Sequence, residues 1–156
     1  MSGEIQFFVN TWIFGDVPLS EVVKRVAAIG FDGIELVGEP KIYKAGEVRT
    51  LVEDHGLKVQ SICGMHPGPE EGDLRALCHP DPAERQKAVD YVRACVDLAK
   101  GVGARSVLVV PSLVGQPAHF VSREEDIKRA IESIQKAGEY AAAQDILLTI
   151  EPINRY

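Results

Sequence analysis

The chain has 156 residues, of which 46% are hydrophobic and 26% charged, a composition typical of one globular domain with a substantial core. It carries 17 Lys and Arg residues against 23 Asp and Glu residues, so its net charge of −6 offers a phosphate backbone no overall attraction, and we expect no nucleic-acid partner. No apolar run is long enough to cross a bilayer and the first residues lack a signal-peptide pattern, so we expect a cytoplasmic protein without a membrane partner. Its three scattered cysteines predict reduced thiols.

Apolar runs rich in β-forming residues alternate along the chain with segments of helical periodicity. The predicted strands are residues 5–9, 33–37, 58–63, 106–110 and 146–150. Apolar stripes at helical spacing predict four intervening helices, marked by Val22 and Val26, Val48 and Val52, Val92 and Val96, and Ile127, Ile131, Ile134 and Ala137. Asp81 before Pro82, and Ser122 before Glu125, predict the starts of the last two helices.

The loops that follow the predicted strands are longer than the loops that follow the helices. The longest runs from Gly64 to about His79, whereas glycines close the predicted helices after only a few residues, at Gly30, Gly56 and Gly103. In parallel α/β proteins, functional groups gather on the loops at the carboxyl ends of the strands. We therefore expect the functional residues at the carboxyl edge of the sheet.

Strand and helix alternation allows either an open doubly wound sheet or a (β/α)8 barrel. No Gly-x-Gly-x-x-Gly turn follows a strand, which argues against a nucleotide-binding doubly wound sheet. Because a complete barrel needs about 250 residues, we expect residues 1–156 to form a single partial TIM-barrel domain with about five parallel strands and four helices. Either the chain is truncated relative to a complete barrel or something covers its open edges, and these edges predict a homo-oligomer.

Three residues that follow predicted strands are candidates for a site: Trp12 after the first, His66 after the third and Glu151 after the fifth. A carboxylate at the mouth of a parallel sheet suits a divalent cation, although Glu151 could equally be a solvated strand-terminal residue. His66 lies among glycines that let a ligand approach, and its alternative is a polar surface position. Trp12 offers an apolar wall for the carbon face of a sugar, or caps the core.

Other polar residues are weaker candidates. Glu35 interrupts an apolar strand, so a buried position would require a partner, and we predict a structural hydrogen bond. Ser112 follows the fourth strand without a Gly-x-Ser-x-Gly elbow, which argues against a serine hydrolase. Glu70, Glu71 and Asp73 are interpreted as a solvated acidic patch.

Taken in order, four stretches resemble the xylose isomerase-like TIM barrel superfamily, particularly its sugar phosphate isomerase/epimerase branch with the tagatose and psicose 3-epimerases. The stretches are residues 30–36, 79–91, 98–105 and 151–156. In these epimerases a Glu-x-x-Asn-Arg-aromatic-Glu stretch begins with a metal-ligating glutamate, which Glu151 would match. It ends with a substrate-contacting glutamate, which would lie beyond Tyr156, as would the family's other metal ligands, because the resemblance covers only the amino-terminal half or so of a member.

The resemblance implies a metal-dependent sugar or sugar-phosphate isomerase or epimerase that transfers a proton next to a carbonyl. Glu151 would be both catalytic base and metal ligand, and Trp12 and His66 would contact the small sugar or sugar-phosphate substrate. The cofactor implied is Mn²⁺, with Co²⁺ or Mg²⁺ as alternatives. Because most ligands are missing, we expect little turnover from this chain alone.

Two alternatives remain open from the sequence. One is a noncatalytic half-barrel that self-associates or binds a small polyol, and a coding frame that continues past Tyr156 would argue against it. The other is an endonuclease IV-like DNA repair enzyme of the same superfamily. Such enzymes use metal-binding histidines after both the third and the fourth strand. The fourth strand here ends in Pro111 and Ser112, which disfavours this reading.

Overall fold

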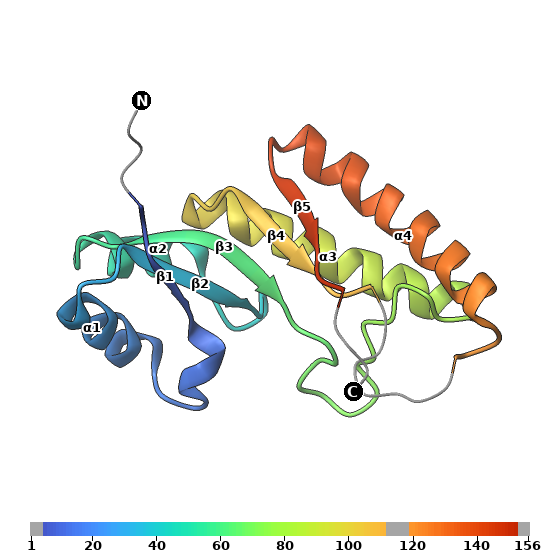
Figure 1. Ribbon diagram of the computed structural model, residues 1–156, viewed down its shortest axis with the longest axis horizontal. Helices are drawn as coiled ribbons and strands as arrows, with labels where there is room; N and C mark the ends of the chain where they lie inside the picture. Colours follow the sequence, from blue (N-terminus) through green and yellow to red (C-terminus); the bar gives the residue numbers. More distant parts are fainter. Residues whose placement is uncertain (1–4, 112–118, 153–156) are drawn as a thin grey trace.

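Strands and helices alternate throughout the computed structural model, which describes residues 5–111 and 119–152. Within these ranges the chain forms five β-strands, four α-helices and a short 3-10 helix, η1 (Figure 1). In chain order they are β1 (Phe8–Asn10), η1 (Thr11–Phe14), α1 (Leu19–Ile29), β2 (Gly33–Gly38), α2 (Ala45–Glu53), β3 (Lys58–Gly64), α3 (Pro82–Val102), β4 (Ser106–Val109), α4 (Arg123–Ala143) and β5 (Leu147–Ile150).

The strands form one parallel sheet in the order β1-β2-β3-β4-β5. Each helix packs against the strands beside it, and together the helices cover one side of the curved sheet (Figure 1). The sequential order confirms the predicted partial (β/α)8 barrel and excludes the doubly wound alternative, in which the strand order reverses. Ser112 and residues 153–156 of the family-like stretch lie outside the described residues.

Because side chains alternate along each strand, the sheet has one face that is buried against the helices and an opposite, open face. Ile34 and Leu36 of β2, Ile62 of β3 and Val107 of β4 are fully buried against the helices, because successive side chains point to opposite sides of a sheet. Glu35 lies between two of these residues and therefore points to the other side. The helix-covered face thus holds the core, and the opposite face is available for polar side chains.

Both predicted helix starts are confirmed by side-chain caps. The Asp81 carboxylate accepts a hydrogen bond from the Ala83 N–H at 2.9 Å, and Pro82 occupies the first turn. The Ser122 hydroxyl accepts from the Glu125 N–H at 3.2 Å. These caps satisfy N–H groups that have no partner inside the helix. The cap residues therefore fix where the two long helices begin.

The helices end in similar turns, in which a residue adopts the left-handed backbone conformation. Gly30 after α1 and Gly103 after α3 have φ of 94° and 79°, the left-handed conformation that glycine adopts without strain. Asp145 has φ of 59° in the corresponding place after α4, where the sequence lacks a glycine. Asp is one of the few other residues that tolerate this conformation. The left-handed turn that follows the other helices is therefore also present after α4, where the sequence has no glycine.

The buried face of α4 differs from the predicted stripe. Ile127 and Ile131, which we expected in the core, are 49% and 51% exposed. The face that packs inward is built mainly from small residues, namely Ala130, Ser133, Ala137 and Ala141. Small side chains allow α4 to approach α3 closely, and the Ser133 hydroxyl donates to the Leu77 carbonyl at 2.8 Å. Ile134 and Ala137 of the predicted stripe do pack on the core, so periodicity found the helix and part of its inner face but misplaced the part at Ile127 and Ile131.

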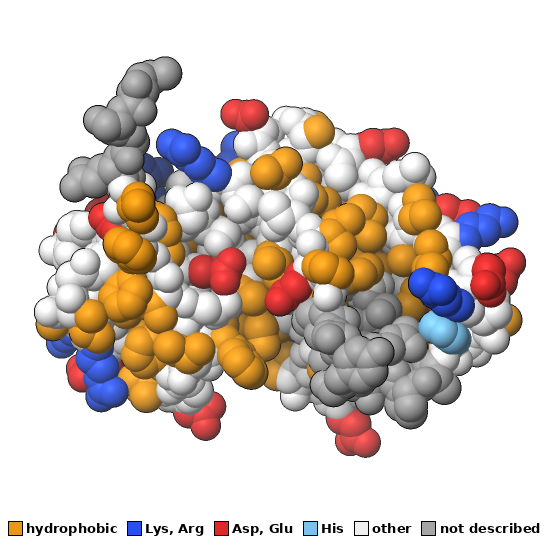
Figure 2. Space-filling view, in the orientation of Figure 1, with side chains coloured by type: hydrophobic (Ala, Val, Ile, Leu, Met, Phe, Trp, Pro, Cys, Tyr) orange, Lys and Arg blue, Asp and Glu red, His pale blue; other side chains and the backbone are white. Residues whose placement is uncertain are grey.

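Apolar side chains remain exposed along the sheet edges. They include Phe7 just before β1, and Leu147 and Ile150 of β5. Figure 2 shows hydrophobic surface over the region of β1 and η1 and again beside β5. Such edges favour association, and self-association stays a prediction. Among the residues described, no helix has both the length and the apolar character needed to cross a bilayer.

Candidate active site

A row of polar side chains crosses the open face of the sheet through β1, β2 and β3. The strand register sets Asn10 opposite Glu35 and Glu35 opposite Ser61. The Asn10 Nδ2 donates to Glu35 Oε2 at 2.7 Å, and the Ser61 Oγ donates to Glu35 Oε1 at 2.7 Å. Both carboxylate oxygens therefore have partners, as predicted for a glutamate placed inside a strand.

Cys63 lies two residues beyond Ser61 on the same face of β3. Burial raises the pKa of the Cys63 thiol, the hydrogen bond with Asn10 opposes this, and the negative charges of Glu35 and Glu151 raise it further. The charge of Glu151 thus acts on β3 from the end of β5. A thiol in this setting stays protonated near neutral pH and is a poor nucleophile.

Glu151 follows β5 at the carboxyl edge of the sheet and is exposed. Its backbone N–H donates to the Val109 carbonyl at 3.0 Å, which extends the β4–β5 pairing by one residue. In the part of the chain that the structure describes, no three His, Cys, Asp or Glu side chains come together in a way that could hold a metal ion. These residues do not fit a complete metal site, and the role of Glu151 as a metal ligand stays a prediction.

Trp12 lies in η1, directly after β1. Its side chain is 63% exposed, and its backbone N–H donates to Asn10 Oδ1 at 2.8 Å. It lines a pocket of about 350 Å³ between η1, the start of α1 and the β2–α2 loop, together with Val37, Glu39 and Tyr43. The indole is therefore accessible at the carboxyl edge, and its contact with a sugar stays a prediction.

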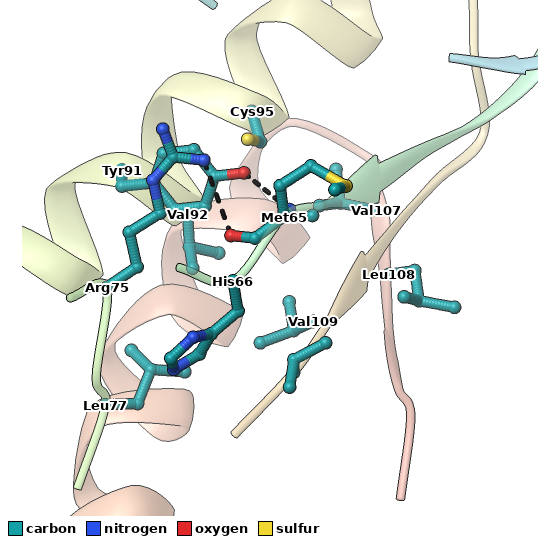
Figure 3. A pocket seen from close by; sticks show the side chains of 12 residues that line it. Met65, His66, Arg75, Leu77, Tyr91, Val92, Cys95, Val107, Leu108 and Val109 are labelled. Atoms are coloured by element: carbon teal, nitrogen blue, oxygen red, sulfur yellow. Dashed lines mark hydrogen bonds between the residues drawn. The ribbon is translucent and has the colours of Figure 1, made fainter. Parts of the chain in front are cut away.

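His66 follows β3 but turns toward the helices. Its ring lies between Leu77 and Val109 (Figure 3), in a narrow pocket that α3 closes with Val92 and Cys95. Both ring nitrogens are buried, and no other residue of the described part of the chain offers them a hydrogen bond. Burial, followed by the charge of Arg75, lowers the pKa of His66 to about 4. His66 and Trp12 therefore line different pockets, and substrate binding by both residues stays a prediction.

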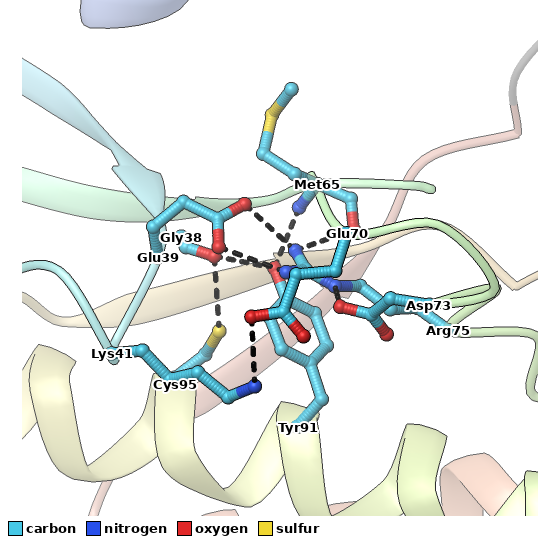
Figure 4. A network of polar contacts seen from close by, with 9 residues as sticks. All are labelled: Gly38, Glu39, Lys41, Met65, Glu70, Asp73, Arg75, Tyr91 and Cys95. Carbon is cyan, nitrogen blue, oxygen red and sulfur yellow. Dashed lines mark hydrogen bonds and ion pairs between the residues drawn. The ribbon is translucent and has the colours of Figure 1, made fainter. Parts of the chain in front are cut away.

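An ion network that the sequence did not indicate closes the long β3–α3 loop (Figure 4). Arg75 has a side chain only 5% exposed, and its two terminal nitrogens donate to the Glu39 carboxylate at 2.9 and 2.8 Å. Its Nε donates to Asp73 at 3.0 Å. The predicted solvated patch is therefore wrong for Asp73, whereas Glu70 pairs with Lys41 on the surface.

Tyr91 of α3 joins the same network to the sheet. Its hydroxyl donates to the Gly38 carbonyl at 2.6 Å and accepts from the Met65 N–H at 2.8 Å, so it ties the ends of β2 and β3 together. Burial raises the pKa of Tyr91, which keeps the hydroxyl protonated and able to donate. The network thus fixes the backbone from which His66 projects.

Comparison with known proteins agrees with this geometry. Residues 23–156 match the sequence profile of a family described as xylose isomerase-like TIM barrel. The chain belongs to this family. Among curated proteins similar to this xylose isomerase-like chain, 3-dehydro-D-guloside 4-epimerase of Escherichia coli is 24% identical over 143 residues, which cover 87% of this chain and 52% of the relative. Hydroxypyruvate isomerase of E. coli is 25% identical over 154 residues, which cover 97% and 57%.

Solved structures similar to this xylose isomerase-like chain share its fold. A D-allulose 3-epimerase from Methylomonas sp., in complex with D-allulose, is similar over 99% of this chain and 54% of its own length, with a TM-score of 0.80 and 20% identity. A xylose isomerase-like TIM barrel protein from Mycobacterium smegmatis, in complex with magnesium, covers 93% and 54% with a TM-score of 0.70 and 20% identity. The chain spans about half the length of these relatives.

Proposed function

We propose that the protein is an isomerase or epimerase that acts on a sugar, a sugar phosphate or a related hydroxycarbonyl compound. The observation that carries the proposal is the position of Glu151, an exposed carboxylate at the carboxyl edge of a barrel-type parallel sheet whose open face carries Asn10, Glu35 and Ser61. The family supports the reaction class, because the two E. coli relatives are an epimerase and an isomerase.

The proposed reaction is proton transfer at the carbon next to a carbonyl. A base removes the proton, and the electron pair left behind moves into the carbonyl to give an enediolate. Return of a proton to the same carbon from the other face inverts it, whereas return to the neighbouring carbon isomerises the substrate. We assign the base to the Glu151 carboxylate because it is accessible at the edge where substrate would enter. Trp12 is proposed to cover the carbon face of the sugar.

We further propose that Glu151 supplies one ligand to a divalent metal, with Mn²⁺ as the first choice and Co²⁺ or Mg²⁺ as alternatives. A bound divalent metal stabilises the negative charge of an enediolate. The described residues lack a complete set of ligands, so the others would lie outside them. The magnesium complex of the M. smegmatis protein supports a divalent metal in the family.

The experiment is solvent exchange in D₂O with the protein encoded by the complete reading frame. Ketoses, their phosphates and hydroxypyruvate are incubated with enzyme and each divalent metal, and NMR follows deuterium at the carbon next to the carbonyl. We expect exchange with at least one compound, and Glu151→Gln should lower its rate by about 10²-fold or more. Glu139→Gln, at an exposed position of α4, is the matched control and should exchange at the wild-type rate.

Two results would overturn parts of the proposal. Wild-type protein that exchanges no proton of any compound in the panel would remove the reaction class and favour a noncatalytic half-barrel. Exchange by Glu151→Gln at the wild-type rate would remove this residue from the mechanism and leave the reaction class standing.

We also propose a homo-oligomer formed through the sheet edges, supported by the exposed Leu147 and Ile150 of β5. Sedimentation velocity of the 156-residue chain over a wide concentration range should show association. Leu147→Lys, which places a charge on the edge strand, should shift the protein toward monomer. A wild-type chain that stays monomeric throughout would contradict the proposal.

A further inference from the structure

We propose that Glu35 is a positioning residue for Trp12. It fixes the side-chain amide of Asn10, and this amide caps the 3-10 helix that carries the indole. Glu35 lies on β2 and Trp12 just after β1, so the positioning runs across two strands rather than along the chain. The benefit to a sugar substrate rests on the proposed function, whereas the positioning itself does not.

Besides its contact with the Cys63 thiol, the Asn10 amide makes two hydrogen bonds that hold it in one orientation. Its Nδ2 donates to Glu35 Oε2 at 2.7 Å, and its Oδ1 accepts from the Trp12 N–H at 2.8 Å. An ionised carboxylate only accepts hydrogen bonds, so Glu35 can satisfy only the NH₂ side of the amide. Rotating the amide by half a turn would set oxygen against carboxylate and NH₂ against N–H. Glu35 thereby keeps the amide oxygen aimed at Trp12.

Glu35 is itself fixed from the far side. The Ser61 hydroxyl of β3 donates to its other oxygen at 2.7 Å, and the pairing of β1 with β2 and of β2 with β3 sets the three residues side by side. The carboxylate therefore bridges two strands with each oxygen engaged. Its position follows from the sheet register.

Besides this cap, Trp12 has one further hydrogen bond in the structure, which its carbonyl accepts from the Gly15 N–H at 3.2 Å. The indole is 63% exposed and so has limited packing of its own. The preceding residue, Thr11, is buried, and its hydroxyl accepts from the Val37 N–H at 3.0 Å. Thr11, the first residue of η1, is therefore held against β2. The Asn10 cap then fixes the backbone direction at the next residue, Trp12.

The test uses the fact that Trp12 is the only tryptophan in the chain. Its time-resolved fluorescence anisotropy therefore reports the picosecond to nanosecond motion of this position alone. Asn10→Asp keeps an oxygen for the Trp12 N–H but loses the donor to Glu35 and faces it with a like charge. We expect the fast depolarisation of the indole to grow about twofold or more in amplitude.

The double variant Asn10→Asp/Glu35→Gln exchanges donor and acceptor. The introduced glutamine donates from its NH₂ group to the introduced aspartate, and its oxygen still accepts from Ser61. We expect the anisotropy decay to return to the wild-type form, a rescue that general destabilisation would not produce. Circular dichroism confirms that each variant is folded.

If Asn10→Asp does not fold, a second pair makes the same comparison. Glu35→Gln retains an acceptor for Asn10, because the Ser61 hydroxyl can turn to accept, and should keep the wild-type decay. Glu35→Met removes the acceptor and should increase the fast motion. Unchanged anisotropy in folded Asn10→Asp or Glu35→Met, or a double variant that is not rescued, would overturn the positioning role. None of these readouts needs a substrate, so failure of the proposed function would leave them intact.

Discussion

The guanidinium carbon of Arg75 lies 3.9 Å from the ring centroid of Tyr91. The cation is thus enclosed between an aromatic face and the carboxylates of Glu39 and Asp73. Burial acts to lower the pKa of Arg75, but the hydrogen bonds that it donates to Glu39 and Asp73, together with the neighbouring negative charge, more than offset this effect, so the pKa is raised and the side chain stays charged. The long β3–α3 loop is therefore held in place by the buried Arg75 cation, whose charge is fully paired.

Removing that charge should strongly destabilise the protein. Arg75→Ala leaves the Glu39 carboxylate, whose side chain is only 12% exposed, without its bidentate partner. Breaking a buried pair by removing one member costs about 3–5 kcal/mol. We expect a loss of this size in the free energy of unfolding, measured by urea denaturation.

The matched control is Arg49→Ala, which removes an ion pair to Glu53 on the surface of α2. These side chains are 54% and 60% exposed, and such pairs contribute at most about 1 kcal/mol. If the two variants lost stability equally, the Arg75 network would contribute no more than a surface ion pair.

The Tyr91 hydroxyl can be tested separately from its ring. Tyr91→Phe keeps the stacking with Arg75 but leaves the Met65 N–H without its partner, and leaves the Gly38 carbonyl only the weak Cys95 thiol donor at 3.9 Å. Unsatisfied buried groups cost about 1–3 kcal/mol, and we expect a decrease of that order in the free energy of unfolding. Tyr140→Phe, which removes an exposed hydrogen bond to Asp97, should leave it unchanged within error. A Tyr91→Phe variant as stable as wild type would show that water replaces the hydroxyl.

Most of the fold was predictable because local signals and topology agree. Buried parallel strands appear as apolar runs in the sequence. The caps at Asp81 and Ser122 mark helix starts through hydrogen bonds between residues only two or three positions apart. The inner face of α4 was not predictable in the same way. Its Ile127 and Ile131 outweigh alanines in any hydrophobic pattern, yet close helix packing favours the small residues.

The candidate site likewise has one part that the sequence predicted and one part that it did not. The need of Glu35 for a partner follows from its place in a strand, and the structure supplies Asn10 and Ser61. The Arg75 network could not be read from the sequence, because its partner Glu39 lies 36 residues away and its neighbours in the loop resemble a solvated acidic patch. Contacts between distant loops depend on the assembled fold, which no local spacing encodes.

Two helical glycines give a paired test of helix packing. A Cβ added at Gly101 of α3 would lie 2.5 Å from the Ala45 Cβ at the start of α2, closer than carbon atoms can approach. Gly101→Ala should therefore force the helices apart and lower the free energy of unfolding by about 1–3 kcal/mol.

The second glycine, Gly138 in α4, has open space where a Cβ would stand. Gly138→Ala should stabilise the protein by about 0.5–1 kcal/mol, because alanine loses less backbone entropy in a helix. Thermal denaturation of both variants checks the prediction. A stabilising effect of alanine at both positions would mean that α2 and α3 separate without loss.

The buried ring of His66 makes the stability of the protein depend on pH. In the folded state burial, and then the charge of Arg75, lowers the pKa of His66 from its ordinary 6.5 to about 4, while Asp73 acts weakly in the opposite direction. In the unfolded chain the imidazole takes up its proton near pH 6.5. Between these values the unfolded state binds more protons, so stability must fall as the pH is lowered.

We therefore expect the His66 contribution to be constant above about pH 6.5, to decline down to about pH 4, and to change no further below it. His66→Leu removes both unpartnered ring nitrogens from a pocket lined by Leu77, Val92 and Val109. The variant should be at least as stable as wild type at pH 7, since an apolar side chain replaces an unsatisfied polar one. Its advantage should widen steadily between pH 6.5 and 4, as measured by urea denaturation at each pH. NMR of the imidazole Cε1–H gives the direct check: titration near pH 6.5 would show that the ring is solvated, whereas titration near pH 4 requires the buried position between the sheet and α3.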